Sequence, residues 1–207
     1  MIYIHHDPFS LAIIAGGQSR RMGRDKAFLR LGGKTIIQRL LERTANLGQA
    51  ETLLITNNPA AYAHLQLPMH GDALPGKGAL GGIYTALLRA TCPVVLALAC
   101  DMPFVNARLL RFMLRQLDAQ TDVVVPRVDG YPQSLHAIYR QTCLPPIRER
   151  LLRDRLKNIG FYPAVRVTYL DEADYAAIDP LGKSFTNLNT PAELEQARLQ
   201  MEKGAIL

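Results

Sequence analysis

Residues 13–26, with the sequence IIAGGQSRRMGRDK, combine the residue types that a phosphate-rich ligand needs. Glycines such as Gly16 and Gly17 allow positive φ angles and present bare backbone N–H groups to an anion. Arg21 and Lys26 supply positive charges that hydroxyl or amide groups could not replace. An ordinary basic surface loop is the alternative, but an apolar run leads directly into these glycines. The segment therefore predicts a phosphate-binding loop at the end of a buried strand.

Strands and helices are expected to alternate along the chain, which is the pattern of a parallel sheet. The apolar residues predict strands at 11–15, 51–56, 93–99, 122–126, 133–139 and 165–170, and helices at 35–47, 60–65, 80–90, 108–117, 146–153 and 191–201. Because the inner strands are apolar throughout, helices must cover both faces of the sheet. Ligands bind such sheets beyond the carboxyl ends of the strands, where the opening loop, Asn57 and Asp101 are expected. We therefore expect an α/β fold in which residues 1–207 form one domain and residues 1–9 an N-terminal extension.

The composition of the 207-residue chain argues against several other classes of protein. The net charge is +6, but the cationic residues are scattered and aromatic residues make up only 7%, so nucleic-acid binding is not expected. The longest apolar runs stop far short of the roughly 20 residues that span a bilayer, and the N-terminus lacks the features of a signal peptide. Three cysteines without a CxxC pair argue against a disulfide framework and a thiolate metal site. We therefore expect a cytoplasmic protein with neither a membrane nor a nucleic acid as partner.

Two glycine-rich segments resemble nucleotide-binding motifs, but each lacks a required part. GKGALG at residues 76–81 matches the dinucleotide fingerprint, and Asp101 lies about twenty residues later, where that motif places its acid. The preceding LPMHGDALP contains two prolines, so no strand runs into these glycines, and a tight turn close to a ligand is expected instead. GGKT at residues 32–35 resembles the end of a Walker A loop, but Phe28 occupies the position of that motif's first glycine. We therefore expect neither a dehydrogenase nor a P-loop, and interpret the second segment as a turn before a helix.

The opening segment AGGQSRRMGRDKAFLRLGGKTIIQRLL resembles the signature of the MobA-like nucleotidyltransferases. The resemblance continues in order through DALPGKGALGGIYTAL, ACDMPF, GYPQSLHAIY and FTNLNTPAEL. It implies a single Rossmann-like three-layer α/β/α domain with a mostly parallel sheet. It further implies an enzyme that transfers GMP from GTP to molybdopterin (the molybdenum cofactor), releases pyrophosphate and uses Mg²⁺, with Mn²⁺ as an alternative. GTP and molybdopterin would be the substrates, and transient contacts with cofactor-biosynthesis or molybdoenzyme-delivery proteins are expected.

The resemblance also implies roles for individual residues of this chain. Asp101 matches the acid that holds magnesium, and Arg21 and Lys26 join it as catalytic residues. The nucleotide would be bound by Ile14, Ala15, Gly16, Gly17, Lys26, Asn57, Asp72, Gly81 and Asp101, whereas Asn187 and Asn189 would help hold the metal or the pterin phosphate. No protein nucleophile is required, because the acceptor's own phosphate attacks the α-phosphorus while the protein aligns the groups and offsets their charge. A single carboxylate with asparagines nearby suits Mg²⁺, although the N-cap of a helix is an alternative role for Asp101.

Two departures from the family pattern bear on the substrates. Ile14 stands where members usually have leucine, and Ser134 replaces a proline in the PQSL segment that is expected on the pterin side. Among enzymes, a cytidylyltransferase acting on the same pterin and a sugar-phosphate nucleotidyltransferase are alternatives. A nucleotide-binding regulatory module without catalysis is the alternative from another class, and the joint presence of Arg21, Lys26 and Asp101 argues against it.

Overall fold

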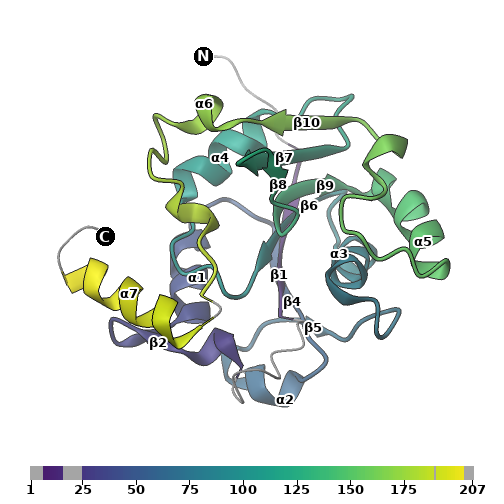
Figure 1. Ribbon diagram of the computed structural model, residues 1–207. Coiled ribbons are helices and arrows are strands. Elements are labelled where there is room, and N and C mark those ends of the chain that lie inside the picture. The colour runs from purple at the N-terminus through teal and green to yellow at the C-terminus, as the bar shows by residue number, and fades with distance from the viewer. Residues whose placement is uncertain (1–6, 16–24, 189, 203–207) are drawn as a thin grey trace.

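A mostly parallel sheet of eight strands forms the middle of the molecule (Figure 1). The computed structural model describes residues 7–15, 25–188 and 190–202, and of residues 191 and 200–202 only the backbone. The strands of this sheet are β1 (Phe9–Ile14), β4 (Glu51–Ile55), β5 (Met69–His70), β6 (Val94–Ala99), β7 (Val123–Val128), β8 (Tyr131–Pro132), β9 (His136–Arg140) and β10 (Val167–Leu170). Their order is β10-β7-β9-β6-β1-β4-β5, with β8 paired to β7, and β9 runs antiparallel to both of its neighbours. The predicted α/β fold with a mostly parallel sheet is therefore confirmed.

Seven α-helices and several 3₁₀ turns connect the strands in the described part of the chain. The helices are α1 (Ile36–Thr44), α2 (Pro59–Tyr62), α3 (Gly78–Arg89), α4 (Ala107–Arg115), α5 (Leu144–Leu152), α6 (Glu172–Tyr175) and α7 (Pro191–Glu202). The 3₁₀ turns are η2 (Lys26–Phe28), η3 (Ala63–Leu65), η4 (Gln141–Cys143), η5 (Tyr162–Ala164) and η6 (Lys183–Phe185). Within the described ranges, no helix is both long and apolar enough to cross a membrane.

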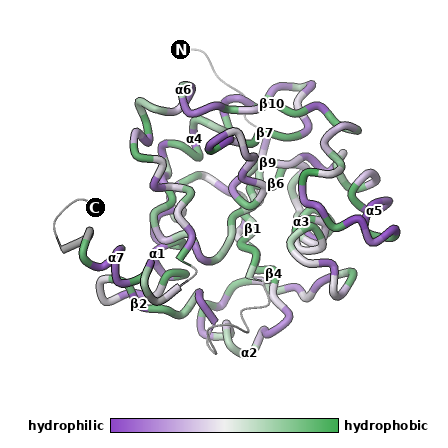
Figure 2. Tube along the Cα trace, viewed as in Figure 1, coloured by the Kyte–Doolittle hydropathy of each residue, from purple (hydrophilic) through white to green (hydrophobic). Residues whose placement is uncertain are grey.

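The sequences of β1 and β6 explain why these strands lie at the centre of the sheet. Every residue of FSLAII and of VVLALA is buried, and Figure 2 shows hydrophobic residues along β1. Successive side chains of a strand point to opposite faces, so Leu11 and Ile13 enter one core while Ala12 and Ile14 enter the other. Helices α1 and α4 cover the first face, and α3 and α5 cover the second (Figure 1). These are the three layers that the sequence predicts.

A short hairpin precedes α1 and carries the second of the two glycine-rich segments. Its strands are β2 (Arg30–Leu31) and β3 (Lys34–Thr35), and Gly32 and Gly33 between them have φ angles of 57° and 80°. Two consecutive positive φ angles are those of the hairpin turn that glycine favours. The side chain of Thr35 then caps α1 by accepting a hydrogen bond from the Gln38 N–H. The interpretation of GGKT as a turn before a helix is therefore confirmed.

Several short elements were not expected from the sequence. β5 and β8 have two residues each and α6 has four, which is too short for an apolar period to develop. β1 begins at Phe9, so the sheet includes the last residue of the 1–9 extension expected from the sequence.

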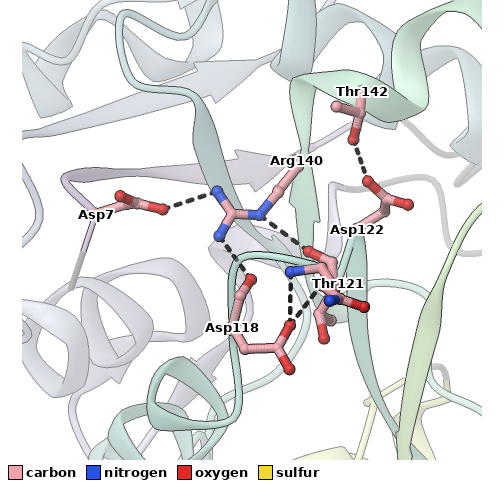
Figure 3. Close-up of polar contacts among 7 residues, drawn as sticks. Asp7, Asp118, Thr121, Asp122, Arg140 and Thr142 are labelled. Carbon is pink, nitrogen blue, oxygen red and sulfur yellow. Dashed lines mark hydrogen bonds and ion pairs between the residues drawn. The ribbon is translucent and has the colours of Figure 1, made fainter. Parts of the chain in front are cut away.

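Arg140, at the end of β9, holds together the edge of the sheet at which β1 and β7 begin (Figure 3). Its guanidinium donates to Asp7 Oδ2 at 2.7 Å, to the Asp118 carbonyl at 2.9 Å and to the Thr121 carbonyl at 2.9 Å. Asp7 precedes β1 and Thr121 precedes β7, so one side chain fixes the start of two strands. Because ligands of such sheets bind at the opposite edge, Arg140 serves the stability of the fold.

Candidate active site

The carboxyl ends of β1, β4 and β6 lie side by side and place predicted site residues next to one another. The Ala15 N–H donates to the carbonyl of the last residue of β4 at 2.8 Å, and the Cys100 N–H donates to the Ile14 carbonyl at 3.2 Å. Asn57 therefore follows β4 on one side of Ile14 and Ala15, and Asp101 follows β6 on the other. The Ile14 carbonyl accepts one hydrogen bond within the sheet, from Cys100, which uses one of its two lone pairs.

Asn57 and Asp72 form a reciprocal pair beyond the ends of β4 and β5. The Asn57 amide nitrogen donates to Asp72 Oδ2 at 2.8 Å, and the Asp72 N–H donates to Asn57 Oδ1 at 2.9 Å. These two hydrogen bonds join loops that are fifteen residues apart. The structure thus brings together two of the predicted nucleotide-binding residues and holds the Asn57 side chain in one orientation.

The glycine-rich segment at residues 76–81 is a tight turn that leads into α3, as predicted. Gly76 and Gly78 have φ angles of 77° and 60°, and α3 begins at Gly78. Within the helix, a Cβ atom at Gly82 would lie 2.8 Å from Ile14 Cγ2. A real Cβ cannot come so close, so glycine at this position lets the start of α3 pack directly against the end of β1. Gly81 lies in the same turn of helix, next to Lys77.

Asp101 and Asn187 present unpartnered oxygen atoms at this edge of the sheet. The Leu188 N–H donates to the Asp101 carbonyl at 3.3 Å, which brings Asn187 and Leu188 alongside the end of β6. Oδ1 of Asp101 and Oδ1 of Asn187 are both buried and have no hydrogen-bond partner among the described residues. Buried polar atoms normally have a partner, so these oxygens are candidates for binding a ligand or an ion.

Among the described cations, Lys26 is the one whose positive charge acts on the pKa of Asp101. Burial raises the pKa of Asp101, the positive charge of Lys26 opposes that shift, and the negative charge of Asp25 adds to it. The N-cap of α4 is Asn106, whose Oδ1 accepts from the Arg108 N–H at 2.9 Å. The alternative role of Asp101 as a helix cap is therefore wrong, and its carboxylate is available for chemistry.

Two residues at this edge were missed by the sequence interpretation. Asp25 is the N-cap of η2, and its Oδ2 accepts a hydrogen bond from the Tyr62 hydroxyl at 2.5 Å. The adjacent Lys26 was a signal for Asp25, but nothing in the sequence pointed to Tyr62. The predicted residues Gly16, Gly17, Arg21 and Asn189 lie outside the described residues.

A mostly parallel sheet with a glycine-rich turn, a cation and a carboxylate beyond its strand ends fits the nucleotidyltransferase class, whose ligands bind at that edge. The chain belongs to the MobA-like NTP transferase family, whose model matches residues 11–161. The family membership that the sequence resemblance implied is therefore confirmed.

Relatives with assigned names cover almost the whole chain. It is similar to a probable molybdenum cofactor guanylyltransferase of Pelotomaculum thermopropionicum, with 38% identity over 190 residues, which is 92% of each chain. Similarity to the molybdenum cofactor guanylyltransferase of Desulfosudis oleivorans amounts to 32% identity over 94% of this chain and 96% of that protein. Among solved structures, molybdopterin-guanine dinucleotide biosynthesis protein A from Archaeoglobus fulgidus has a TM-score of 0.81 and 26% identity, covering 94% of this chain and 99% of that one.

Proposed function

We propose that this protein transfers GMP from GTP to molybdopterin and releases pyrophosphate. The observation that carries the proposal is the pair of buried, unpartnered side-chain oxygens of Asp101 and Asn187 at the carboxyl edge of the sheet, where the positive charge of Lys26 also acts on Asp101. A cation and an anionic ion-binding group at one place are what a reaction between two phosphorylated substrates needs. The names of relatives that are 38% and 32% identical over more than nine-tenths of the chain support the choice of substrates.

Mg²⁺ fits the donor atoms at this site, and Mn²⁺ is the alternative. Asp101 would hold the ion through its carboxylate, together with the side-chain oxygen of Asn187, because both are hard oxygen donors. In the part of the chain that the structure describes, no three or more His, Cys, Asp or Glu side chains are grouped so that they could hold a metal ion. A site with one carboxylate is typical of Mg²⁺ that is bound jointly with substrate phosphates. When bound, the ion supplies positive charge that stabilises the departing pyrophosphate.

The chain's own residues bind and align the two substrates rather than react with them. Lys26 attracts phosphate oxygens of GTP, and the loop with Gly16, Gly17 and Arg21 is proposed to surround them. The acceptor phosphate attacks the α-phosphorus, the new phosphorus–oxygen bond forms, and the bond to pyrophosphate breaks. No group of the protein becomes covalently attached, so alignment and charge supply the rate enhancement.

The nucleoside and the acceptor are proposed to bind at different parts of the edge. Ile14, Ala15, Asn57, Asp72 and Gly81 are proposed to contact the nucleotide, since they gather at the ends of β1, β4 and β5 and at the start of α3. The hydrogen bond from the Leu188 N–H to the Asp101 carbonyl brings Asn187 to this edge, and Asn187 and Asn189 are proposed to help hold the metal or the pterin phosphate.

A nucleotide competition assay tests this function. Purified protein, Mg²⁺ and molybdopterin are incubated with equal concentrations of GTP, CTP and ATP, and the dinucleotide products and pyrophosphate are measured. We expect the guanine dinucleotide as the main product, because a site that pairs polar groups with one base leaves them unpaired with another. Asp101→Asn serves as the inactive control.

Each alternative function gives a different result in the same assay. A preference for CTP would identify a cytidylyltransferase, and turnover with sugar phosphates in place of molybdopterin would identify a sugar-phosphate nucleotidyltransferase. Binding of GTP without any product would identify a regulatory module.

The three cysteines are all free, which agrees with a cytoplasmic setting for the proposed reaction. In that setting the product would pass to cofactor-biosynthesis or molybdoenzyme-delivery proteins.

A further inference from the structure

The turn that carries Lys26 depends on side chains from another part of the chain. η2 has three residues, and the hydrogen bonds of a 3₁₀ turn have poorer geometry than those of an α-helix. Tyr62, the last residue of α2, has 0% exposure and lies against η2, with its ring centroid 4.7 Å from that of Phe28. The centroid of the His64 ring lies 5.7 Å from that of Phe28. α2 and the following η3 therefore support η2 by packing.

A chain of two hydrogen bonds connects Tyr62 to this turn. The Tyr62 hydroxyl donates to Asp25 Oδ2 at 2.5 Å, and Asp25 Oδ1 accepts from the Ala27 N–H at 3.1 Å. Burial raises the pKa of Tyr62, so its hydroxyl keeps the proton that it donates. Both oxygens of Asp25 have partners, in contrast to Oδ1 of Asp101, so the two acids have different tasks. Asp101 offers an oxygen to a ligand, whereas Asp25 fixes the backbone next to Lys26.

The segment from the end of β4 to the end of α2 also contains Asn57, which is proposed to contact the nucleotide. Asn57 and Asn58 follow β4, Pro59 then starts α2, and Tyr62 ends it. At one end of this segment Asn57 is hydrogen-bonded to Asp72, and at the other end Tyr62 is hydrogen-bonded to Asp25. The short helix α2 therefore connects the Asn57–Asp72 pair to the turn that carries Lys26. Proline at the first position of the helix has the φ angle that a helix needs, which makes this connection stiff.

We propose that Tyr62 is a positioning residue for nucleotidyl transfer: through Asp25 it holds the η2 turn so that Lys26 faces the substrate phosphates. This inference rests on the proposed function, in which Lys26 binds those phosphates. In this arrangement α2 fixes the position of Lys26, which binds phosphate, relative to Asn57, which contacts the nucleotide.

Tyr62→Phe tests the inference, because it removes one hydroxyl and keeps the ring that packs on Phe28. In the protein without substrates, hydrogen exchange of the Ala27 amide should become roughly tenfold faster, since Asp25 loses its second partner. In the transfer reaction, kcat should fall about tenfold while the KM for GTP changes much less, as expected for a loss of alignment.

A double-mutant cycle with Lys26→Ala separates positioning from general support of the fold. If Tyr62 acts through Lys26, then Tyr62→Phe lowers kcat no further in the Lys26→Ala background, although it lowers the melting temperature equally in both backgrounds. The matched control is Tyr175→Phe. Tyr175 is also buried, at 2% exposure, and its hydroxyl donates to the Arg127 carbonyl at 2.7 Å, so its loss should change neither kcat nor exchange at Ala27.

Two results would overturn the role of Tyr62. One is an unchanged exchange rate at Ala27 in Tyr62→Phe, and the other is an equal loss of kcat with and without Lys26. If the wild-type protein transferred no nucleotide, the proposed function would fail, and the exchange rate at Ala27 would still decide whether Tyr62 holds the turn.

Discussion

His136 should make the stability of this protein fall as the medium becomes mildly acidic. The residue begins β9, has 0% exposure, and neither of its ring nitrogens has a hydrogen-bond partner within the described residues. Its ring lies against Phe185, with centroids 4.8 Å apart. Burial lowers the pKa of His136 from 6.5 to about 4, and the negative charge of Asp179 only partly opposes this shift.

The direction and size of the effect follow from linkage between protonation and folding. Between the unfolded value of 6.5 and the folded value of about 4, the unfolded chain binds a proton on His136 and the folded protein does not. The free energy of unfolding therefore keeps its full value above pH 6.5 and decreases as the pH falls from 6.5 toward about 4. From about pH 7 to about pH 5, the contribution of this residue is a loss of about 2 kcal/mol.

Urea unfolding of the wild type and His136→Phe at both pH values measures this contribution. Phenylalanine keeps a ring against Phe185 but cannot take a proton, so its free energy of unfolding should fall about 2 kcal/mol less than that of the wild type. At neutral pH the variant should be at least as stable, because two buried nitrogens without partners are removed. His64→Gln, which removes an exposed imidazole, is the control and should keep the wild-type difference. Equal pH dependence in the wild type and His136→Phe would refute the reasoning.

Three further variants separate catalysis from stability. Asp101→Asn should abolish transfer and leave the melting temperature within a few degrees of the wild type, because it keeps the side-chain shape and removes the charge that holds the ion; transfer within a few-fold of the wild type would contradict that role. Lys26→Ala should lower kcat by about 10²-fold as well as weaken GTP binding, since its charge is needed most as pyrophosphate departs; a change confined to KM would show a binding role alone. Arg140→Ala should lower the free energy of unfolding by about 1–3 kcal/mol, because the carbonyls of Thr121 and Asp118 lose a charged donor. The variant should keep the wild-type kcat, and a lower kcat in the fully folded variant would contradict the placement of Arg140 away from the site.

The sequence by itself determined the sheet and the layers. The continuous apolar runs of β1 and β6 are only six residues long and therefore favour strands that are buried on both faces. Helical spacing after Thr35, together with its capping side chain, indicates α1. The turn at Gly32 and Gly33 was also predictable, because positive φ angles are a local property of glycine. Asp101 was expected at the site because it follows a strand, Lys26 because it is a cation in the glycine-rich loop, and the family resemblance implied the role of each.

Tertiary structure decided which of these residues meet and what holds them. Elements of two residues, such as β5, exist only because a neighbouring strand supplies hydrogen bonds, so no local pattern reveals them. The hydrogen bond between Tyr62 and Asp25 spans 37 residues, and the placement of Asn187 beside Asp101 spans more than twice that separation. Such contacts depend on how helices and loops pack across the sheet, and side-chain periodicity within one segment carries no information about its distant partners. The burial of His136 has the same origin, since the side chain that covers it, Phe185, comes from a later turn of the chain.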